Sequence, residues 1–492
     1  MNFSELKQTL FARSNFGMKL GLARMEDALA LLGEPHRAAP VLHVAGSNGK
    51  GSTCAFTESA LRAAGLKTGL YTSPHLVHFC ERIRIGGMPI PEERAAALLA
   101  EILARVPWAC SGGPAGATDG DGLTFFELVT LMAFLVFAQE AVDVMVIEVG
   151  LGGRLDATNV VSPLACAIAP LALEHTQHLG DTLEQIAAEK AGIIKPGIPV
   201  ASAGQALAAA EVLEETAARA GALLWRPGRD YRFESRDEKP FCYQSGLRAI
   251  APEMLGVQSN SEIVGMQTIS RDGDANRAWT VRATIPATHE ERLARDSRSG
   301  LSLRGHHQRE NAALACALLE LAARRGLRVS PEHVEQGLLT AQWPGRMQLA
   351  ATQPSVFLDG AHNPHGAQAL ARTLREEFAG QPLQLVFGAL ADKDLAQTLA
   401  PLLPLAAAIH LCAPDSPRAL PATVIAAKVY ELAPALPCFA YDSSVNALAA
   451  ARGAAQPSGT VIACGSLYLV GELLAALANR PREAMPSEKL SR

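Results

Sequence analysis

The segment Val41–Thr53, with the sequence VLHVAGSNGKGST, decides the fold. Residues 41–45 form an apolar run that predicts a buried strand, and a helical pattern covers residues 54–64. Between the two, three glycines surround Lys50. Glycines let backbone N–H groups approach a phosphate, the helix N-terminus adds partial positive charge, and the lysine neutralises the outer oxygens. The segment therefore predicts a phosphate-binding loop. Gly51 departs from the strict P-loop pattern, so an ordinary glycine turn is the alternative.

The composition places the chain among globular proteins. Its 492 residues predict two or three domains, and 49% of them are hydrophobic against 19% charged. A net charge of -5 gives no electrostatic case for nucleic acid or an anionic membrane. The longest strongly apolar run, residues 128–138, is too short to span a bilayer, and the first residues lack an apolar signal core. The 9 cysteines contain no CxxC pair, which suits free thiols in a reducing compartment. We expect a cytoplasmic protein.

Alternating apolar runs and helical patterns predict an α/β fold in two parts. Residues 1–342 are expected to form an ATP- and metal-binding domain with a P-loop-type parallel sheet, interrupted by an irregular, partly β insert at about 227–302. The Trp-Pro-Gly stretch in WPGRMQ predicts a hinge. Residues 343–480 are expected to form a smaller Rossmann-like domain. Residues 481–492 are expected to be a flexible tail.

Three side chains that suit a hard metal follow predicted strands of the first domain. Ser73 follows the run at residues 66–70, Glu148 ends VDVMVIEV, and His175 comes just after a third apolar run. Carboxyl ends of parallel strands meet at one edge of a sheet, where a magnesium-ordering acid is usually placed beside a phosphate loop. The alternatives are a plain serine turn, a structural glutamate and a histidine without a ligand role.

Two other charged groups allow ordinary interpretations. Lys190 lies beside Glu189 in a predicted helix, and such a pair is normally a solvated ion pair. Arg154 and Asp156, in GLGGRLDATN, allow a simple ion pair within a turn.

The second domain offers Asp359 and His362 at the end of its first predicted strand, where a ligand is expected. Together with the hinge, this pattern suits a nucleotide closed between two domains and a reaction at its γ-phosphate. From the residues alone, the chain is an ATP- and Mg²⁺-dependent transferase, ligase or ATPase.

The phosphate loop GSNGKGS resembles that of the folylpolyglutamate synthase and dihydrofolate synthase family, which is related to the Mur ligases. The resemblance recurs along most of the chain, in SPHL, GLGGRLDATN, HQ-x-x-NA, WPGRMQ, DGAHNPHG and FGALADKD. It implies that ATP phosphorylates a substrate carboxylate and that the amino group of L-glutamate attacks the acyl phosphate, as an acid–amino-acid ligase does. Dihydropteroate, tetrahydrofolate or both are the implied acceptors.

The resemblance also implies roles for residues. It assigns ATP binding to Gly49, Lys50, Gly51, Ser52, Asn311, Arg346, Asp359 and His362, with Asn311 at the adenine. It assigns pterin binding to Leu20, Gly21, Leu22, Thr124, Phe125, Leu155, Asp156 and Ala157. It assigns two Mg²⁺ ions to Ser73, Glu148, His175 and Lys190, the last as a carbamate, and admits K⁺. Lys50, Lys190 and His175 are the implied catalytic residues. The family has an Asp-His pair where this chain has Glu174-His175, which puts the role of the aspartate in doubt here.

Two rival functions stay open. A Mur-type or other amino-acid ligase would act on a non-folate carboxylate, and Thr124 and Asp156 argue against it. A regulatory P-loop ATPase would turn over ATP without an amino acid. In the preferred interpretation the partners are small molecules, with neither nucleic acid nor membrane, and the chain is a monomer.

Overall fold

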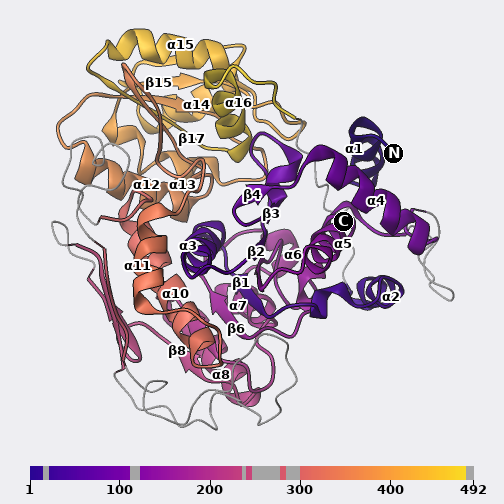
Figure 1. The fold of residues 1–492 in the computed structure, drawn as a ribbon. Helices are drawn as coiled ribbons and strands as arrows, with labels where there is room; N and C mark the ends of the chain where they lie inside the picture. Colours follow the sequence, from indigo (N-terminus) through magenta and orange to yellow (C-terminus); the bar gives the residue numbers. More distant parts are fainter. Residues whose placement is uncertain (15–20, 111–121, 235–239, 247–277, 284–299, 484–492) are drawn as a thin grey trace.

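The computed structural model describes residues 1–14, 21–110, 122–234, 240–246, 278–283 and 300–483. Figure 1 shows two α/β halves, the second in orange to yellow against the first in indigo, magenta and, for residues 300–340, coral. The predicted fold class is confirmed: a large parallel-rich sheet is followed by a second α/β unit. Leu20 and most of the predicted insert lie outside the described residues.

The first half is built on an eight-stranded sheet with the order β4-β3-β2-β5-β1-β6-β7-β8. Its strands are β1 (Val41–Ala45), β2 (Thr68–Tyr71), β3 (Ile83–Ile85), β4 (Met88–Pro89), β5 (Val144–Glu148), β6 (Ala165–Ile168), β7 (Val200–Ser202) and β8 (Leu224–Trp225). Strands β2, β5, β1, β6, β7 and β8, neighbours in this order, pair in parallel. Strands β3 and β4 add an antiparallel edge next to β2. The central strands are buried along their whole length, which is why they are continuous apolar runs in the sequence.

Helices cover both faces of this sheet. They are α1 (Phe3–Ser14), α2 (Ala23–Leu31), α3 (Lys50–Ala63), α4 (Glu92–Arg105), α5 (Phe125–Gln139), α6 (Thr176–Leu179), α7 (Leu183–Ala191), α8 (Leu207–Arg219), α10 (His306–Ala323) and α11 (Pro331–Thr340). Helix α3 lies against α10 and α11 (Figure 1). It begins at Lys50, earlier than the predicted Cys54, because Gly49 turns the chain with a φ of 88° directly before it.

A small antiparallel sheet occupies the described part of the predicted insert. It consists of β9 (Tyr231–Phe233), β10 (Cys242–Ser245) and β11 (Thr280–Arg282), as the alternation near Trp279 predicted. Its Tyr243 and Ser245 donate to the buried carboxylate of Glu320 in α10, at 2.9 and 2.7 Å. These bonds attach the sheet to the first half.

The second half has a six-stranded sheet with the order β12-β13-β17-β14-β15-β16. Its strands are β12 (Gln348–Thr352), β13 (Ser355–Leu358), β14 (Leu383–Phe387), β15 (Ala406–Leu411), β16 (Cys438–Ala440) and β17 (Thr460–Cys464), and its helices are α12 (Pro364–Glu377), α13 (Leu395–Leu399), α14 (Ala422–Leu432), α15 (Ser444–Ala455) and α16 (Leu467–Leu477). All pairs are parallel except the edge pair of β12 and β13. The domain boundaries stay a prediction.

Two further expectations concern the thiols and membrane-spanning helices. All nine cysteines are free thiols, as predicted. In the described part of the chain, no helix is both long enough and apolar enough to cross a membrane.

Arg482 and Glu483, which belong to the predicted flexible tail, have defined partners on the first half. Arg482 donates to the carbonyl of Leu76, and Glu483 pairs with Lys7 at 2.8 Å. These two residues are therefore part of the ordered fold, and residues 484–492 lie outside the described part.

Candidate functional site

A cavity of about 370 Å³ lies between the two halves and is lined by residues of both. On the first half, four neighbouring parallel strands send their carboxyl ends toward it. The phosphate loop follows β1, Ser73 follows β2, Glu148 ends β5, and Glu174 with His175 follow β6. Sheet order thus brings together side chains that are separated by up to about 130 residues of sequence.

The second half contributes in the same way. Its neighbouring parallel strands β13, β17, β14 and β15 are followed by the cavity-lining residues Asp359, Ser466, Lys393 and Arg418, in that order. The cavity is therefore enclosed by the carboxyl ends of two parallel sheets, the usual position of a ligand in open α/β folds.

Most of the predicted site residues line this one cavity. They are Gly21, Gly49, Lys50, Gly51, Ser52, Ser73, Thr124, Phe125, Glu148, Leu155, Asp156, Ala157, His175, Asn311, Arg346, Asp359 and His362. Leu22 and Lys190 do not line it. The common location of the other predicted site residues is a structural finding, whereas the role of each residue stays a prediction.

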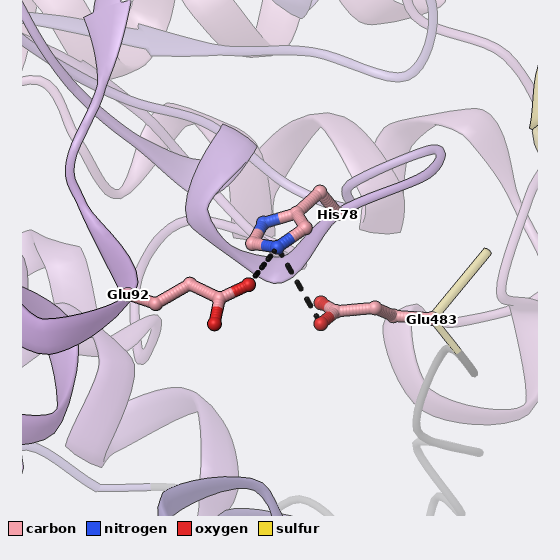
Figure 2. A group of neighbouring side chains, drawn as sticks. All are labelled: His78, Glu92 and Glu483. Carbon is pink, nitrogen blue, oxygen red and sulfur yellow. Dashed lines mark hydrogen bonds and ion pairs between the residues drawn. The ribbon is translucent and has the colours of Figure 1, made fainter. Parts of the chain in front are cut away.

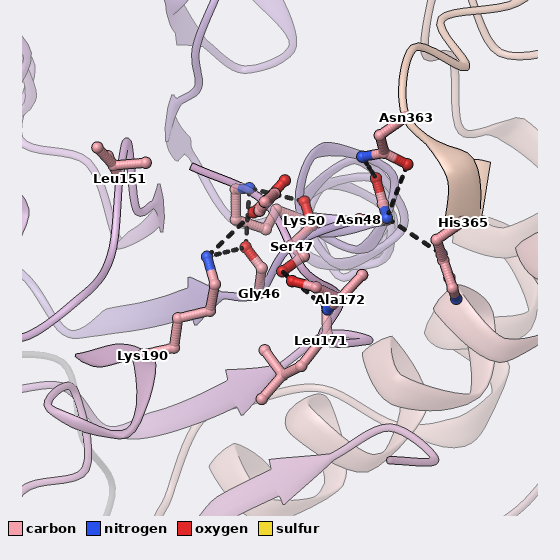
Figure 3. Close-up of polar contacts among 12 residues, drawn as sticks. Gly46, Ser47, Asn48, Lys50, Leu151, Leu171, Ala172, Lys190, Asn363 and His365 are labelled. Atoms are coloured by element: carbon pink, nitrogen blue, oxygen red, sulfur yellow. Dashed lines mark hydrogen bonds and ion pairs between the residues drawn. The ribbon is translucent and has the colours of Figure 1, made fainter. Parts of the chain in front are cut away.

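Hydrogen bonds within the phosphate loop and to the segment that follows β6 fix its conformation (Figure 3). Lys50 Nζ donates to the carbonyl oxygens of Gly46 and Ser47 at 2.9 and 3.1 Å. The hydroxyl of Ser47 donates to the carbonyl of Ala172 and accepts from its N–H, both at 3.1 Å. Lys50 is therefore folded over its loop, next to the backbone N–H groups that would hold a phosphate.

Gly49 is required at its position for two reasons. Its φ of 88° lies in the left-handed region, and a Cβ built on it would collide with the side-chain amide of Asn311 in α10. Asn311 donates to Gln308 Oε1 at 3.0 Å. The residue predicted to contact the adenine therefore packs directly against the phosphate loop.

Ser73, Glu148 and His175 fit a hard divalent cation. The Glu148 carboxylate is buried and accepts from the N–H of Ser73 at 3.1 Å; burial raises its pKa, against the opposing effect of Lys50. Burial lowers the pKa of His175 to about 4, against the opposing charge of Glu174, so its imidazole is neutral at neutral pH. A carboxylate whose charge is poorly solvated, a hydroxyl and a neutral imidazole on one cavity wall are compatible with Mg²⁺.

His175 also has a left-handed backbone, with a φ of 50°. Such strain in a residue other than glycine occurs most often at functional sites.

Lys190 is buried rather than solvated, and its partner is Glu174 and not Glu189. Its ammonium donates to Glu174 Oε1 at 3.2 Å and to the carbonyl of Gly46 at 2.9 Å. Burial lowers the pKa of Lys190 to about 8. Burial by itself would raise the pKa of Glu174, but the charges of Lys190 and then of Lys50 outweigh it and lower that pKa to about 2. The interpretation of Lys190 as part of a solvated pair with Glu189 is therefore wrong.

Glu189 instead pairs with Arg154 at 2.7 Å. An ion pair between Arg154 and Asp156 within the turn, the other ordinary interpretation, is therefore wrong as well. The physical reason is that helix α7 lies beside the GLGGRLDATN loop and supplies the nearer carboxylate.

Asp156 organises that loop. Its carboxylate accepts from the N–H groups of Leu151 and Thr158 at 2.9 and 3.0 Å and from the Thr158 hydroxyl at 2.5 Å. The Thr158 oxygen is also 2.9 Å from Nε2 of His43, a fully buried residue of β1. Because the Thr158 hydroxyl donates to Asp156, His43 donates to Thr158, and the loop is connected to the strand that precedes the phosphate loop.

The segment before the apolar helix is similarly well ordered. Thr124 caps α5 and forms a capping box with Glu127, and Phe125 is buried yet lines the cavity. Phe125, which the resemblance assigns to pterin binding, therefore belongs to the hydrophobic core and also lines the cavity.

On the second half, Asp359 positions the chain around the hinge. Its carboxylate accepts from the N–H groups of Met347 and Ala361, both at 2.9 Å. His362 Nδ1 donates to the carbonyl of Gly360 at 2.7 Å, and burial lowers its pKa to about 4. Arg346 and Asp359 line the cavity, the first from the segment that joins the halves and the second from the strand end.

Several cavity residues were not predicted from sequence. Arg82 donates through Nε to His75 Nδ1 at 2.9 Å, and its guanidinium lies 5.1 Å from the Phe125 ring centroid. Lys393 and Arg418 follow β14 and β15, so their position after a buried run was the available signal. No comparable local signal precedes Arg82, whose place depends on the turn between β2 and β3.

A second cluster, away from the cavity, brings His78, Glu92 and Glu483 together (Figure 2). His78 Nδ1 accepts from the N–H of Cys80, so the ring proton is on Nε2, which donates to Glu92 Oε1 at 2.8 Å. A metal would need the lone pair of that same nitrogen, and Lys7 already pairs with Glu483. The cluster is therefore a hydrogen-bonded junction rather than a metal centre.

Comparisons with known proteins agree with this geometry. Residues 345–467 match the family model of the Mur ligase, glutamate ligase domain. The dihydrofolate synthase/folylpolyglutamate synthase of Bacillus subtilis is 36% identical over 419 residues, which are 85% of this chain and 86% of that protein.

Solved structures are similar over nearly the full length. Mycobacterium tuberculosis folylpolyglutamate synthase complexed with ADP has a TM-score of 0.80 at 28% identity, covering 98% of this chain and 99% of that chain. E. coli FolC in complex with DHPP and ADP has a TM-score of 0.76 at 30% identity, covering 97% and 98%.

Proposed function

Because the chain belongs to the dihydrofolate synthase/folylpolyglutamate synthase family, we propose that it is an ATP-dependent ligase that joins L-glutamate to the carboxylate of a folate or pterin acid. The observation that carries the proposal is the single cavity in which the phosphate loop, the GLGGRLDATN loop and the strand ends of the second half meet. A nucleotide, an acid and an amino acid must all be adjacent for this reaction, and this cavity is lined by candidate residues for the nucleotide and for the acid.

The chemistry follows from the weakness of a carboxylate as an acylating agent. A carboxylate oxygen of the acid attacks the γ-phosphorus of ATP, and ADP leaves. The amino group of glutamate then attacks the acyl phosphate carbon, phosphate leaves, and the amine proton is released. Lys50 and the N–H groups of its loop stabilise the charge on the transferred phosphoryl group. Asp359 and Arg346 hold the rest of the nucleotide, and the loop organised by Asp156 holds the pterin.

Two Mg²⁺ ions belong to the proposal because Ser73, Glu148 and His175 fit them. When bound, the ions neutralise charge on the phosphates and on the phosphorylated acid. The role of K⁺ and the monomeric state stay predictions.

The carbamate on Lys190 also belongs to the proposal. Formation of a carbamate requires the neutral amine to attack CO₂ with loss of a proton, and a pKa of about 8 brings that form within reach at neutral pH. Lys190 would have to exchange its bond to Glu174 for the new group. Incubation with ¹³C-bicarbonate and NMR detects it: a carbamate signal that Lys190→Met abolishes supports the assignment, and an unchanged spectrum refutes it.

Phosphate release from ATP and Mg²⁺ tests the function, with glutamate and either dihydropteroate or tetrahydrofolate added separately. Release that requires both glutamate and a pterin supports the ligase, and the accepted pterin identifies the reaction. Release with glutamate and a non-folate acid only would favour a Mur-type ligase. Release that is indifferent to both would favour a regulatory ATPase.

A further inference from the structure

Three side chains join the tip of the phosphate loop to the second half of the molecule. Asn363 Nδ2 donates to Asn48 Oδ1 at 3.0 Å, and Asn48 Nδ2 lies 3.4 Å from Asn363 Oδ1 and 3.0 Å from His365 Nδ1. Asn48 directly precedes Gly49 and Lys50, whereas Asn363 and His365 begin helix α12. Figure 3 shows the three side chains pointing toward one another across the boundary between the halves.

A backbone N–H group determines the orientation of the Asn363 amide. Asn363 is the N-cap of α12, and its Oδ1 accepts from the N–H of Gly366 at 2.8 Å. This bond identifies Oδ1 and Nδ2 of Asn363, so Nδ2 donates to Asn48 Oδ1, and Asn48 Nδ2 lies between Asn363 Oδ1 and the ring nitrogen of His365. The cap of helix α12 thus orients the Asn363 amide so that its N–H group donates to the phosphate loop.

We propose that Asn48 and Asn363 are positioning residues that set the register between the phosphate loop and the second half, so that nucleotide binding and closure of the two halves are one coupled event. The inference rests on the proposed function, because that function places the reacting phosphoryl group between the halves. Lys50 lies two residues from Asn48, and on the other side His362 directly precedes Asn363 and Asp359 lies four residues before it. A displacement of about 1 Å between such groups is enough to lower a transfer rate by orders of magnitude.

Another contact between the halves provides a matched control. Arg304, just before α10, pairs with Glu377 at 3.3 Å at the far end of the same helix α12. Glu377→Gln therefore weakens the boundary without touching the phosphate loop. If any loss of contact between the halves had the same effect, this variant would reproduce it.

Binding of AMPPCP with Mg²⁺, measured by titration calorimetry, tests the coupling independently of ligase activity. The variants are Asn48→Ala, Asn363→Ser and the double variant; the serine that replaces Asn363 keeps a hydroxyl that caps α12 but is too short to reach Asn48. We expect each single variant to bind about tenfold more weakly, with the double variant no weaker than Asn48→Ala, since Asn48→Ala already removes every contact with Asn48 that Asn363→Ser removes. We expect Glu377→Gln to change affinity by less than about twofold and to be additive with Asn48→Ala.

Additive losses for Asn48→Ala and Asn363→Ser, or equal losses for Glu377→Gln, would overturn the proposal. In the ligase assay, we expect Asn363→Ser to lower kcat about tenfold with the KM for the pterin within about twofold, because the predicted pterin residues all lie on the first half. A wild-type protein without ligase activity would instead refute the proposed function. The AMPPCP affinities of the variants could still be interpreted.

Discussion

The ammonium groups of Lys50 and Lys190 donate to the same acceptor, the carbonyl oxygen of Gly46, each at 2.9 Å (Figure 3). Two cations at one carbonyl repel each other, and the nearby carboxylate of Glu174 balances them, since both lysines lower its pKa. Lys50 must leave the carbonyls of its own loop to meet a phosphate, whereas Lys190 is retained by Glu174. The two lysines therefore have different surroundings although they share an acceptor, and we expect different tasks for them.

Replacement of Lys50 by methionine tests its proposed task. We expect Lys50→Met to lower kcat/KM by about 10²–10³-fold, because the transferred phosphoryl group loses its nearest side-chain cation. The melting temperature should change little, since the partners of Lys50 are loop carbonyls at the edge of the cavity. Lys67→Met, which removes an exposed lysine paired with Glu140, is the control and should retain activity. Normal activity of Lys50→Met would contradict the phosphate-binding role.

The buried pair of Lys190 and Glu174 makes a prediction about stability. Glu174→Gln leaves the Lys190 ammonium buried without a carboxylate, and we expect a loss of about 3–5 kcal/mol in the free energy of unfolding by urea. The double variant Glu174→Gln/Lys190→Met removes both charges and should recover most of that loss. Additive losses in the double variant would show that the pair does not interact as the structure indicates.

His43 makes stability dependent on pH. Burial lowers its pKa from the ordinary 6.5 to about 3, so between these values the unfolded chain binds one proton more than the folded chain. The stability contributed by neutral His43 is therefore present above pH 6.5 and is lost as the pH falls toward 3, by about 1.4 kcal/mol per pH unit. In this window, His43→Gln should reduce the slope of the unfolding free energy against pH by about 1.4 kcal/mol per pH unit, the contribution of one proton. An unchanged slope would contradict the assignment.

A side chain at position 49 would have two effects, backbone strain and overlap with Asn311, and these can be measured separately. Gly49→Ala places a side chain on a left-handed residue and against Asn311, whereas Gly65→Ala does the first alone, because Gly65 has a φ of 77° and open space around it. We expect Gly65→Ala to lose about 1–2 kcal/mol of stability and to keep nucleotide affinity. Gly49→Ala should lose the affinity as well, because its methyl group displaces the side chain of Asn311. Equal behaviour of Gly49→Ala and Gly65→Ala would show that the contact has no role.

Much of the fold was predictable because its signals are local. The strand before the phosphate loop, the strand that ends at Glu148 and the two α/β units follow from apolar runs and helical spacing. The edge strands β3, β4, β12 and β16 and the helix α11 were not predicted. The edge strands are short or only partly buried, so their hydrophobic patterns are weak.

The charge pairs show where local interpretation ends. The sequence places Arg154 near Asp156 and Lys190 beside Glu189, but the fold pairs Arg154 with Glu189 and Lys190 with Glu174. The preferred partner of a charge is the nearest opposite charge in space, and the packing of α7 on the sheet decides which one that is. Spacing along the chain carries no information about it.

By itself, the sequence determined the phosphate loop, the α/β class and the polar residues that follow the central strands, because each depends on only a few neighbouring residues. The tertiary structure decided that these strand ends share one cavity, that Lys190 is buried beneath the loop, and that Asn48 meets Asn363 across 315 positions of sequence. These relationships depend on the order of strands in two sheets and on how the sheets face each other. That order is set by packing over the whole chain, which no short stretch of sequence contains.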